Sequence, residues 1–139
     1  MKTNFNKNKI EEDKLITNPL LEFINYMKKL IKKKGMSKRD VFYLSDIPVN
    51  YGYKLLLGEK RTKQRDIIIR ICFCSKFDIN ELQEALRLYE MPELYLRIKR
   101  DKMIAEALKK ELKNIDAFNE FLIKNNVEPL KSCGEDKDI

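Results

Sequence analysis

The stretch of residues 37–58, SKRDVFYLSDIPVNYGYKLLLG, constrains the fold of this chain more than any other part of the sequence. Ser37 followed by Asp40 is a capping-box signal, because the serine oxygen can accept from a free N–H of the first helical turn and the acid favours the positive helix end. A helix is therefore predicted to begin at Ser37. It breaks before Pro48, since the residue preceding proline is disfavoured in the α conformation, and proline suits a first helical position. A second helix should start near Pro48 and end before Gly58, which supplies a positive φ.

Two short helices joined by a tight turn in this register resemble the lambda-repressor-like family of DNA-binding domains, also called Xre-type or Cro-type helix-turn-helix proteins. In that pattern a small polar cap stands twenty-one residues before the glycine that ends the recognition helix, as Ser37 and Gly58 do. The run YGYKLLLGEKR, with the later Arg65-Asp66, looks like a Gram-positive branch of such regulators. The resemblance covers residues 19–90 and implies an all-α fold: a five-helix domain whose recognition helix enters the major groove of DNA.

Three residues depart from the family pattern. Phe42 stands where a small alanine usually lies against the recognition helix, and Gly52 stands where a β-branched residue usually faces it. We expect these two changes to compensate each other, because a large ring opposite a glycine conserves the volume between the helices. Asp46 replaces the glycine of the turn, and Asp tolerates the left-handed conformation better than most residues.

Three further helices complete the five that the resemblance implies for residues 18–90. Asn18-Pro19 is an N-cap followed by a first-turn proline, ahead of an amphipathic segment that stops at Gly35. Residues 65–76 carry an apolar set too wide for one exposed face and are predicted to form the central buried helix. Asp78 should cap the next helix, with Glu81 three residues later. The side chains of that helix predicted to return to the core are Leu82, Ala85, Leu86 and Tyr89.

Residues 91–130 are predicted to form a C-terminal helical extension that the minimal DNA-binding domain does not need. Its helices carry two apolar sets, which are Ile104, Leu108, Leu112 and Ile115, and then Phe118, Phe121 and Leu122. The extension can pad the same core, hold two copies together as a homodimer, or contact another protein, and the sequence leaves all three open. Residues 1–17 are interpreted as a polar, disordered arm, and residues 131–139 as a disordered tail.

Composition restricts the partners and the compartment. A net charge of +7, from 29 basic and 22 acidic residues, favours a polyanionic partner. No apolar run approaches the roughly 18 residues of a membrane span, and the N-terminus lacks the apolar core of a secretory signal. Three cysteines cannot all pair with one another, so a reduced, cytoplasmic protein is expected.

Catalysis finds little support in this sequence. The chain has no histidine, which excludes Ser-His, Cys-His and His-ligated metal sites, and its 4 glycines form no phosphate-binding loop. Cys72 and Cys74 are two residues apart, so on a helix they are rotated by about 200° and cannot share a metal. We expect buried structural cysteines, no cofactor and no enzymatic activity.

The recognition helix is expected to present its N-terminal residues and those one turn later to base edges. Val49, Asn50, Tyr53 and Lys54 would face the groove, with Tyr51 at its edge. Asn50 can pair with adenine, Lys54 can donate to guanine, and Val49 can touch a thymine methyl. Core packing is the alternative for both tyrosines, and a purely solvated role is the alternative for Asn50 and Lys54.

Basic residues on both sides of this helix are expected to contact phosphates: Lys38, Arg39, Lys60, Arg61, Lys63 and Arg65. Lys38 and Arg39 fall in the first turn of the preceding helix, where backbone N–H groups also favour an anion. For Arg65 the alternative is pairing inside the protein.

The resemblance and these residues together predict a sequence-specific regulator that binds double-stranded DNA as a homodimer on a palindromic operator and represses by occluding a promoter. The alternative is a helical protein-interaction module with residual DNA binding, such as an antirepressor, an inhibitor of a nucleic-acid enzyme or a kinase partner. That alternative would use residues 91–130 for its partner.

Overall fold

The computed structural model describes residues 19–133, and this part of the chain is entirely helical, without a strand. Its helices are α2 (Pro19–Lys33), α3 (Lys38–Leu44), α4 (Val49–Leu56), α5 (Arg65–Cys74), α6 (Ile79–Leu88), α7 (Lys99–Lys109) and α8 (Ile115–Lys124). The expected all-α class is confirmed. The predictions made for residues 1–17, for Asn18 as a cap and for residues 134–139 lie outside the described residues. None of the described helices has the length and apolar character that crossing a membrane requires.

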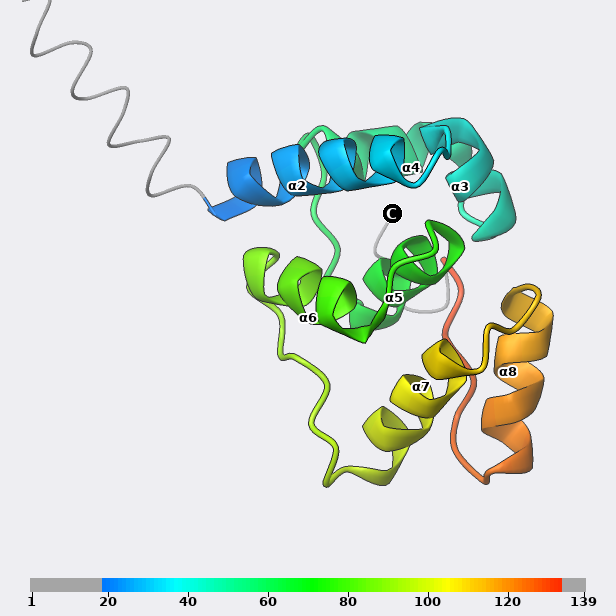
Figure 1. Cartoon of the computed structure of the whole chain (residues 1–139). Helices are drawn as coiled ribbons and strands as arrows, with labels where there is room; N and C mark the ends of the chain where they lie inside the picture. The colour runs from blue at the N-terminus through cyan, green and yellow to red at the C-terminus, as the bar shows by residue number, and fades with distance from the viewer. Residues whose placement is uncertain (1–18, 134–139) are drawn as a thin grey trace, which may run out of the picture.

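The helices form three tiers with α5 at the centre. In Figure 1, α2, α3 and α4 lie on one side of α5 and α6, and α7 and α8 lie on the other. Eight of the ten residues of α5 are buried, namely Asp66, Ile67, Ile68, Ile69, Arg70, Ile71, Cys72 and Cys74. A helix covered on all sides buries nearly every side chain, so the prediction of a central buried helix from residues 65–76 is confirmed.

The helix starts follow the capping residues. Ser37 Oγ accepts a hydrogen bond from the Asp40 N–H at 3.1 Å, which confirms the predicted start of α3. Asp78 and Glu81 form a reciprocal capping box at the start of α6, with distances of 2.8 and 2.9 Å. The start of α4 differs by one residue, because Pro48 is its cap and not its first helical residue.

Ile104, Ile115, Phe118 and Leu122, from the two apolar sets of the extension, are buried within the same chain, whereas Leu108, Leu112 and Phe121 are half-buried. Ile104, Phe118 and Leu122 are completely buried and belong to one core with α5. The rings of Phe73 and Phe118 meet edge to face, with centroids 4.7 Å apart. Of the three roles that the sequence left open for residues 91–130, this burial supports core packing, and these side chains are not available to a second copy.

Two crossed ion pairs join the starts of α5 and α7. Arg65 pairs with Asp101, and Asp66 pairs with Arg100 through two hydrogen bonds of 3.1 and 2.9 Å. Both carboxylates are buried. The N–H of Lys131 also donates to Asp66 at 2.8 Å. The prediction of a disordered tail from residue 131 onward therefore begins too early, because α5 holds this residue in place.

Arg70 connects the end of α3 with the end of the described chain. Its buried guanidinium donates to the carbonyl oxygens of Ser45, Leu130 and Lys131, at 3.1, 2.8 and 2.7 Å. Three carbonyl acceptors satisfy a charge that would otherwise be costly to bury. The extension is thus held against the segment that follows α3.

Candidate nucleic-acid interface

The connection between α3 and α4 is a tight turn with a left-handed residue at its centre. Asp46 has φ 58°, as predicted for the residue that replaces the turn glycine. The Ile47 N–H donates to the Phe42 carbonyl at 3.0 Å, and the buried Ser45 hydroxyl donates to the Val41 carbonyl at 2.6 Å. These bonds satisfy the end of α3 and fix the direction in which α4 leaves.

Phe42 and Gly52 determine how closely α3 and α4 approach. A Cβ placed on Gly52 would lie 2.5 Å from atoms of the Phe42 ring, well inside van der Waals contact. The expectation that these two departures from the family pattern compensate each other is confirmed. On the neighbouring position of α4, the Tyr53 ring meets Phe42 edge to face, with centroids 5.1 Å apart.

α4 has one exposed face and one buried face. Asn50 and Lys54, one turn apart, are exposed, whereas Tyr51 and Leu55 lie in the core. Val49 and Tyr53 are half-buried and pack against the core. Tyr51, placed by the sequence at the edge of the groove, has its ring in the core, which is the alternative stated for it. Of the four residues expected to face the groove, Asn50 and Lys54 are therefore exposed, whereas Val49 and Tyr53 are only half-exposed.

The basic residues around α4 divide into two groups. Arg39, Lys60 and Lys63 are exposed and Lys38 is half-buried. Within residues 19–133, none of these four forms a salt bridge, and neither does Lys54. The Lys60 N–H donates to the Lys54 carbonyl at 3.1 Å, so the loop after α4 returns to the end of that helix.

Arg61 and Arg65 make intramolecular contacts. The Arg61 guanidinium lies 5.1 Å from the centre of the Tyr89 ring and donates to the Tyr89 carbonyl at 3.0 Å. Arg65 pairs with Asp101 and also donates to the carbonyl of Pro92 at 3.3 Å. Internal pairing is the alternative stated for Arg65, and the structure favours it over a phosphate contact. The internal contacts of Arg61 were not anticipated.

Sequence reasoning missed a groove that the extension forms beside the motif. Its volume is about 920 Å³, and the α3–α4 connection forms one wall, with Tyr43, Leu44 and Asp46. The other wall includes Asn114 and Asp116 at the start of α8. No local signal could have revealed it, because the two walls come from segments about seventy residues apart in the chain.

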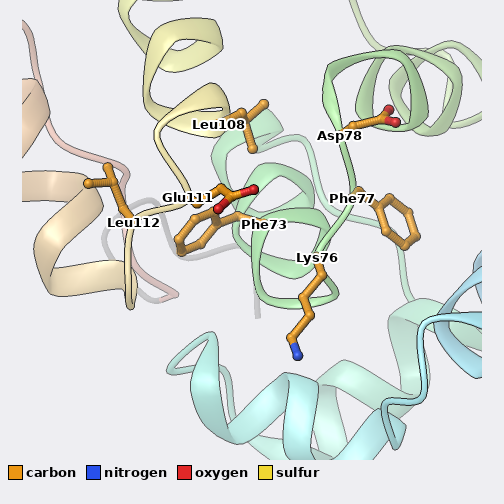
Figure 2. A pocket seen from close by; sticks show the side chains of 7 residues that line it. All are labelled: Phe73, Lys76, Phe77, Asp78, Leu108, Glu111 and Leu112. Atoms are coloured by element: carbon orange, nitrogen blue, oxygen red, sulfur yellow. The ribbon is translucent and has the colours of Figure 1, made fainter.

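A smaller cleft, of about 380 Å³, lies at the C-terminal end of α5. Figure 2 shows Phe73 and Phe77 on the α5 side and Leu108 and Leu112 on the α7 side. Its volume falls at the lower end of the range of small-molecule sites, about 300–1,000 Å³. None of its lining residues belongs to α3 or α4, so this cleft is separate from those two helices.

The cysteines and acidic residues form no metal-ligand cluster in the described part of the chain. There, no three side chains among Cys, Asp and Glu come together as metal ligands. Burial raises the pKa of the Cys72 and Cys74 thiols, which keeps them protonated and unreactive at neutral pH.

No protein-family model matches the chain, and no curated protein or solved structure matches it either. The resemblance to Xre-type proteins therefore stays an expectation from the residues of the motif.

Proposed function

We propose that this protein binds double-stranded DNA through α4 and regulates transcription at the bound site. The observation that carries the proposal is the pair Asn50 and Lys54, exposed on one face of a helix whose opposite face is buried. Major-groove readers need polar side chains that project one turn apart from a firmly held helix. The Phe42–Gly52 contact and the hydrogen bonds around Ser45 hold α4 in this way.

In this proposal the contacts have two kinds of role. Asn50 reads adenine and Lys54 reads guanine, because an amide matches the donor and acceptor of adenine and an ammonium matches the two acceptors of guanine. Lys38, Arg39, Lys60 and Lys63 position the domain on phosphates and carry no sequence information. Arg61 and Arg65 are left out of this set, since their guanidinium groups contact other parts of the chain. The net charge of +7 strengthens binding to any DNA.

Repression follows most simply if the bound protein occludes a promoter. Ile104, Phe118 and Leu122 cannot supply the proposed pairing of two copies on a two-fold operator, because they lie in the core. Leu108 and Leu112 are half-buried and line the smaller cleft.

Selection from random duplex DNA tests the proposal. The protein should enrich a shared motif at moderate salt, and Asn50→Ala or Lys54→Ala should each weaken binding to that motif by about 1–3 kcal/mol while leaving binding to scrambled DNA nearly unchanged. Glu120→Ala, an exposed change on α8, is the control and should leave both unchanged. The absence of any enriched motif, or equal losses on motif and scrambled DNA, would contradict base reading by α4.

A further inference from the structure

The connector between α6 and α7 presents three large apolar side chains to solvent. Tyr95, Leu96 and Ile98 are 54%, 55% and 51% exposed, and the basic residues Arg97 and Lys99 stand among them and are also exposed. A cluster of exposed apolar residues in a well-folded protein commonly marks a contact surface. In Figure 1 this connector projects from the lower end of the molecule, where the chain enters α7.

The connector is held rigidly despite its exposure. The Ile98 N–H donates to the Tyr95 carbonyl at 2.9 Å, which closes a turn over residues 95–98. The Tyr95 N–H donates to the buried Asp101 carboxylate at 2.9 Å. Just before the turn, Leu94 exchanges two hydrogen bonds with the Gln83 side chain, at 2.7 and 2.9 Å. A turn that is already ordered loses little conformational entropy when it binds.

The groove beside the α3–α4 connection has the opposite charge and an apolar lining. Tyr43, Leu44 and Val49 give it an apolar lining, Asp46 and Asp116 are its charged residues, and no basic residue lines it. Within residues 19–133, neither of these carboxylates forms a salt bridge, and the same holds for Arg97 and Lys99. A projecting apolar and basic turn thus fits a hollow that is apolar and acidic.

We propose that the 95–98 turn of one copy of this chain docks in the groove beside the α3–α4 connection of a second copy, with Arg97 between Asp46 and Asp116. One copy cannot fill its own groove, because Figure 1 places the connector and the facing ends of α3 and α8 on opposite sides of the molecule. Because the turn and the groove lie on opposite sides of each copy, the contact joins copies head to tail. The contact needs no DNA, so it can be tested separately from the proposed function.

Sedimentation of charge-reversal variants tests this contact. The full chain should self-associate over about 1–200 µM, and Arg97→Glu or Asp116→Lys should each weaken association by about tenfold or more, since each places like charges together in every contact. Mixing the two variants should restore association to the wild-type level. Where the two variants alternate, the two reversed charges face each other in one contact, and the unchanged Arg97 and Asp116 face each other in the next.

Matched controls separate this contact from a general effect of charge. Lys28→Glu and Glu120→Lys make the same changes in charge at exposed positions outside the groove and the turn, and they should not alter association. Circular dichroism should show that all variants remain helical. The proposal is overturned if the full chain stays monomeric, if the controls weaken association as much, or if the mixed variants do not recover. If the full chain stays monomeric but a chain that ends at Cys133 associates, the occupant of the groove is the segment 134–139. That outcome would also overturn the proposal.

Discussion

At the scale of single residues, the close packing of α3 against α4 depends on the contact between Phe42 and Gly52. The ring takes the space that a side chain at position 52 would need, so the two helices can lie close together around one aromatic residue. Glycine inside a helix costs about 1 kcal/mol relative to alanine. That cost is offset by packing, because Phe42 is completely buried and also contacts Tyr53.

A double-mutant cycle at these two positions should show strong coupling. Gly52→Ala alone should destabilise the protein by about 1–3 kcal/mol, because the new methyl overpacks against the ring. In a Phe42→Ala background the same change should be neutral or stabilising, since the methyl then partly fills a cavity and alanine favours the helix. Urea unfolding of the four proteins measures the coupling. Additive effects would mean that the ring moves away from position 52 freely.

At the scale of elements, the sequence predicted most helix starts and most helix ends. Ser37 and Asp78 carry the capping oxygen that a start requires, and both were assigned correctly. The ends at Gly35 and Gly58 were also visible, because both glycines adopt positive φ. Several other ends use non-glycine residues in the same conformation, namely Lys76, Glu90, Glu111 and Asn126. The sequence placed helix ends close to Lys76, Glu90 and Asn126, whereas the end of α7 before Glu111 was not predicted.

The placement of the extension and the roles of individual site residues required the structure. The apolar stripe Ile104, Leu108, Leu112 and Ile115 was assigned to one helix, but α7 ends at Lys109 and Ile115 begins α8. Apolar periodicity also does not state which surface covers such a stripe. Arg65 and Asp101 are 36 residues apart, and an ion pair at that separation leaves no local pattern. Tyr51 was misplaced because its burial depends on the rotation of α4 against the core. Asn50 and Lys54, whose exposure follows from the same rotation, were placed as predicted.

The ion pair between Arg65 and Asp101 should matter far more than a surface pair. Asp101→Ala would leave the partly buried Arg65 without its carboxylate and the Tyr95 N–H without its acceptor. Removing one partner of a buried pair costs about 3–5 kcal/mol, and the partial exposure of Arg65 brings the expected loss to about 3 kcal/mol or less. Glu84→Ala, which removes the exposed pair with Arg87, is the matched control and should scarcely change the free energy of unfolding. Equal effects of the two substitutions in urea unfolding would contradict a structural role for the crossed pairs.

At the scale of the whole molecule, lysines beside α4 lack salt bridges within the described residues, whereas arginines at the junction of α5 and α7 are paired. Arg65, Arg70 and Arg100 hold the extension against α5 through carboxylates and carbonyl oxygens. Lys38 and Lys63, on either side of α4, form no salt bridge within residues 19–133. Lysines that remain unpaired are available to phosphates, whereas the arginines already have acceptors.

The contrast between lysines without salt bridges and paired arginines predicts how the proposed DNA binding should respond to salt. Each phosphate that the protein neutralises releases counterions, and the slope of log K against log salt changes by roughly 0.9 for each contact. Replacing Lys38 and Lys63 together with Gln should therefore weaken binding to every sequence and reduce the steepness of that slope by about 1.8. The double variant Lys28→Gln with Lys124→Gln removes the same charge from α2 and α8 and should leave the slope nearly unchanged. Fluorescence anisotropy on scrambled duplex DNA at several salt concentrations measures both. If the two double variants change the slope equally, the cations beside α4 have no special role, and binding depends only on the net charge of the molecule.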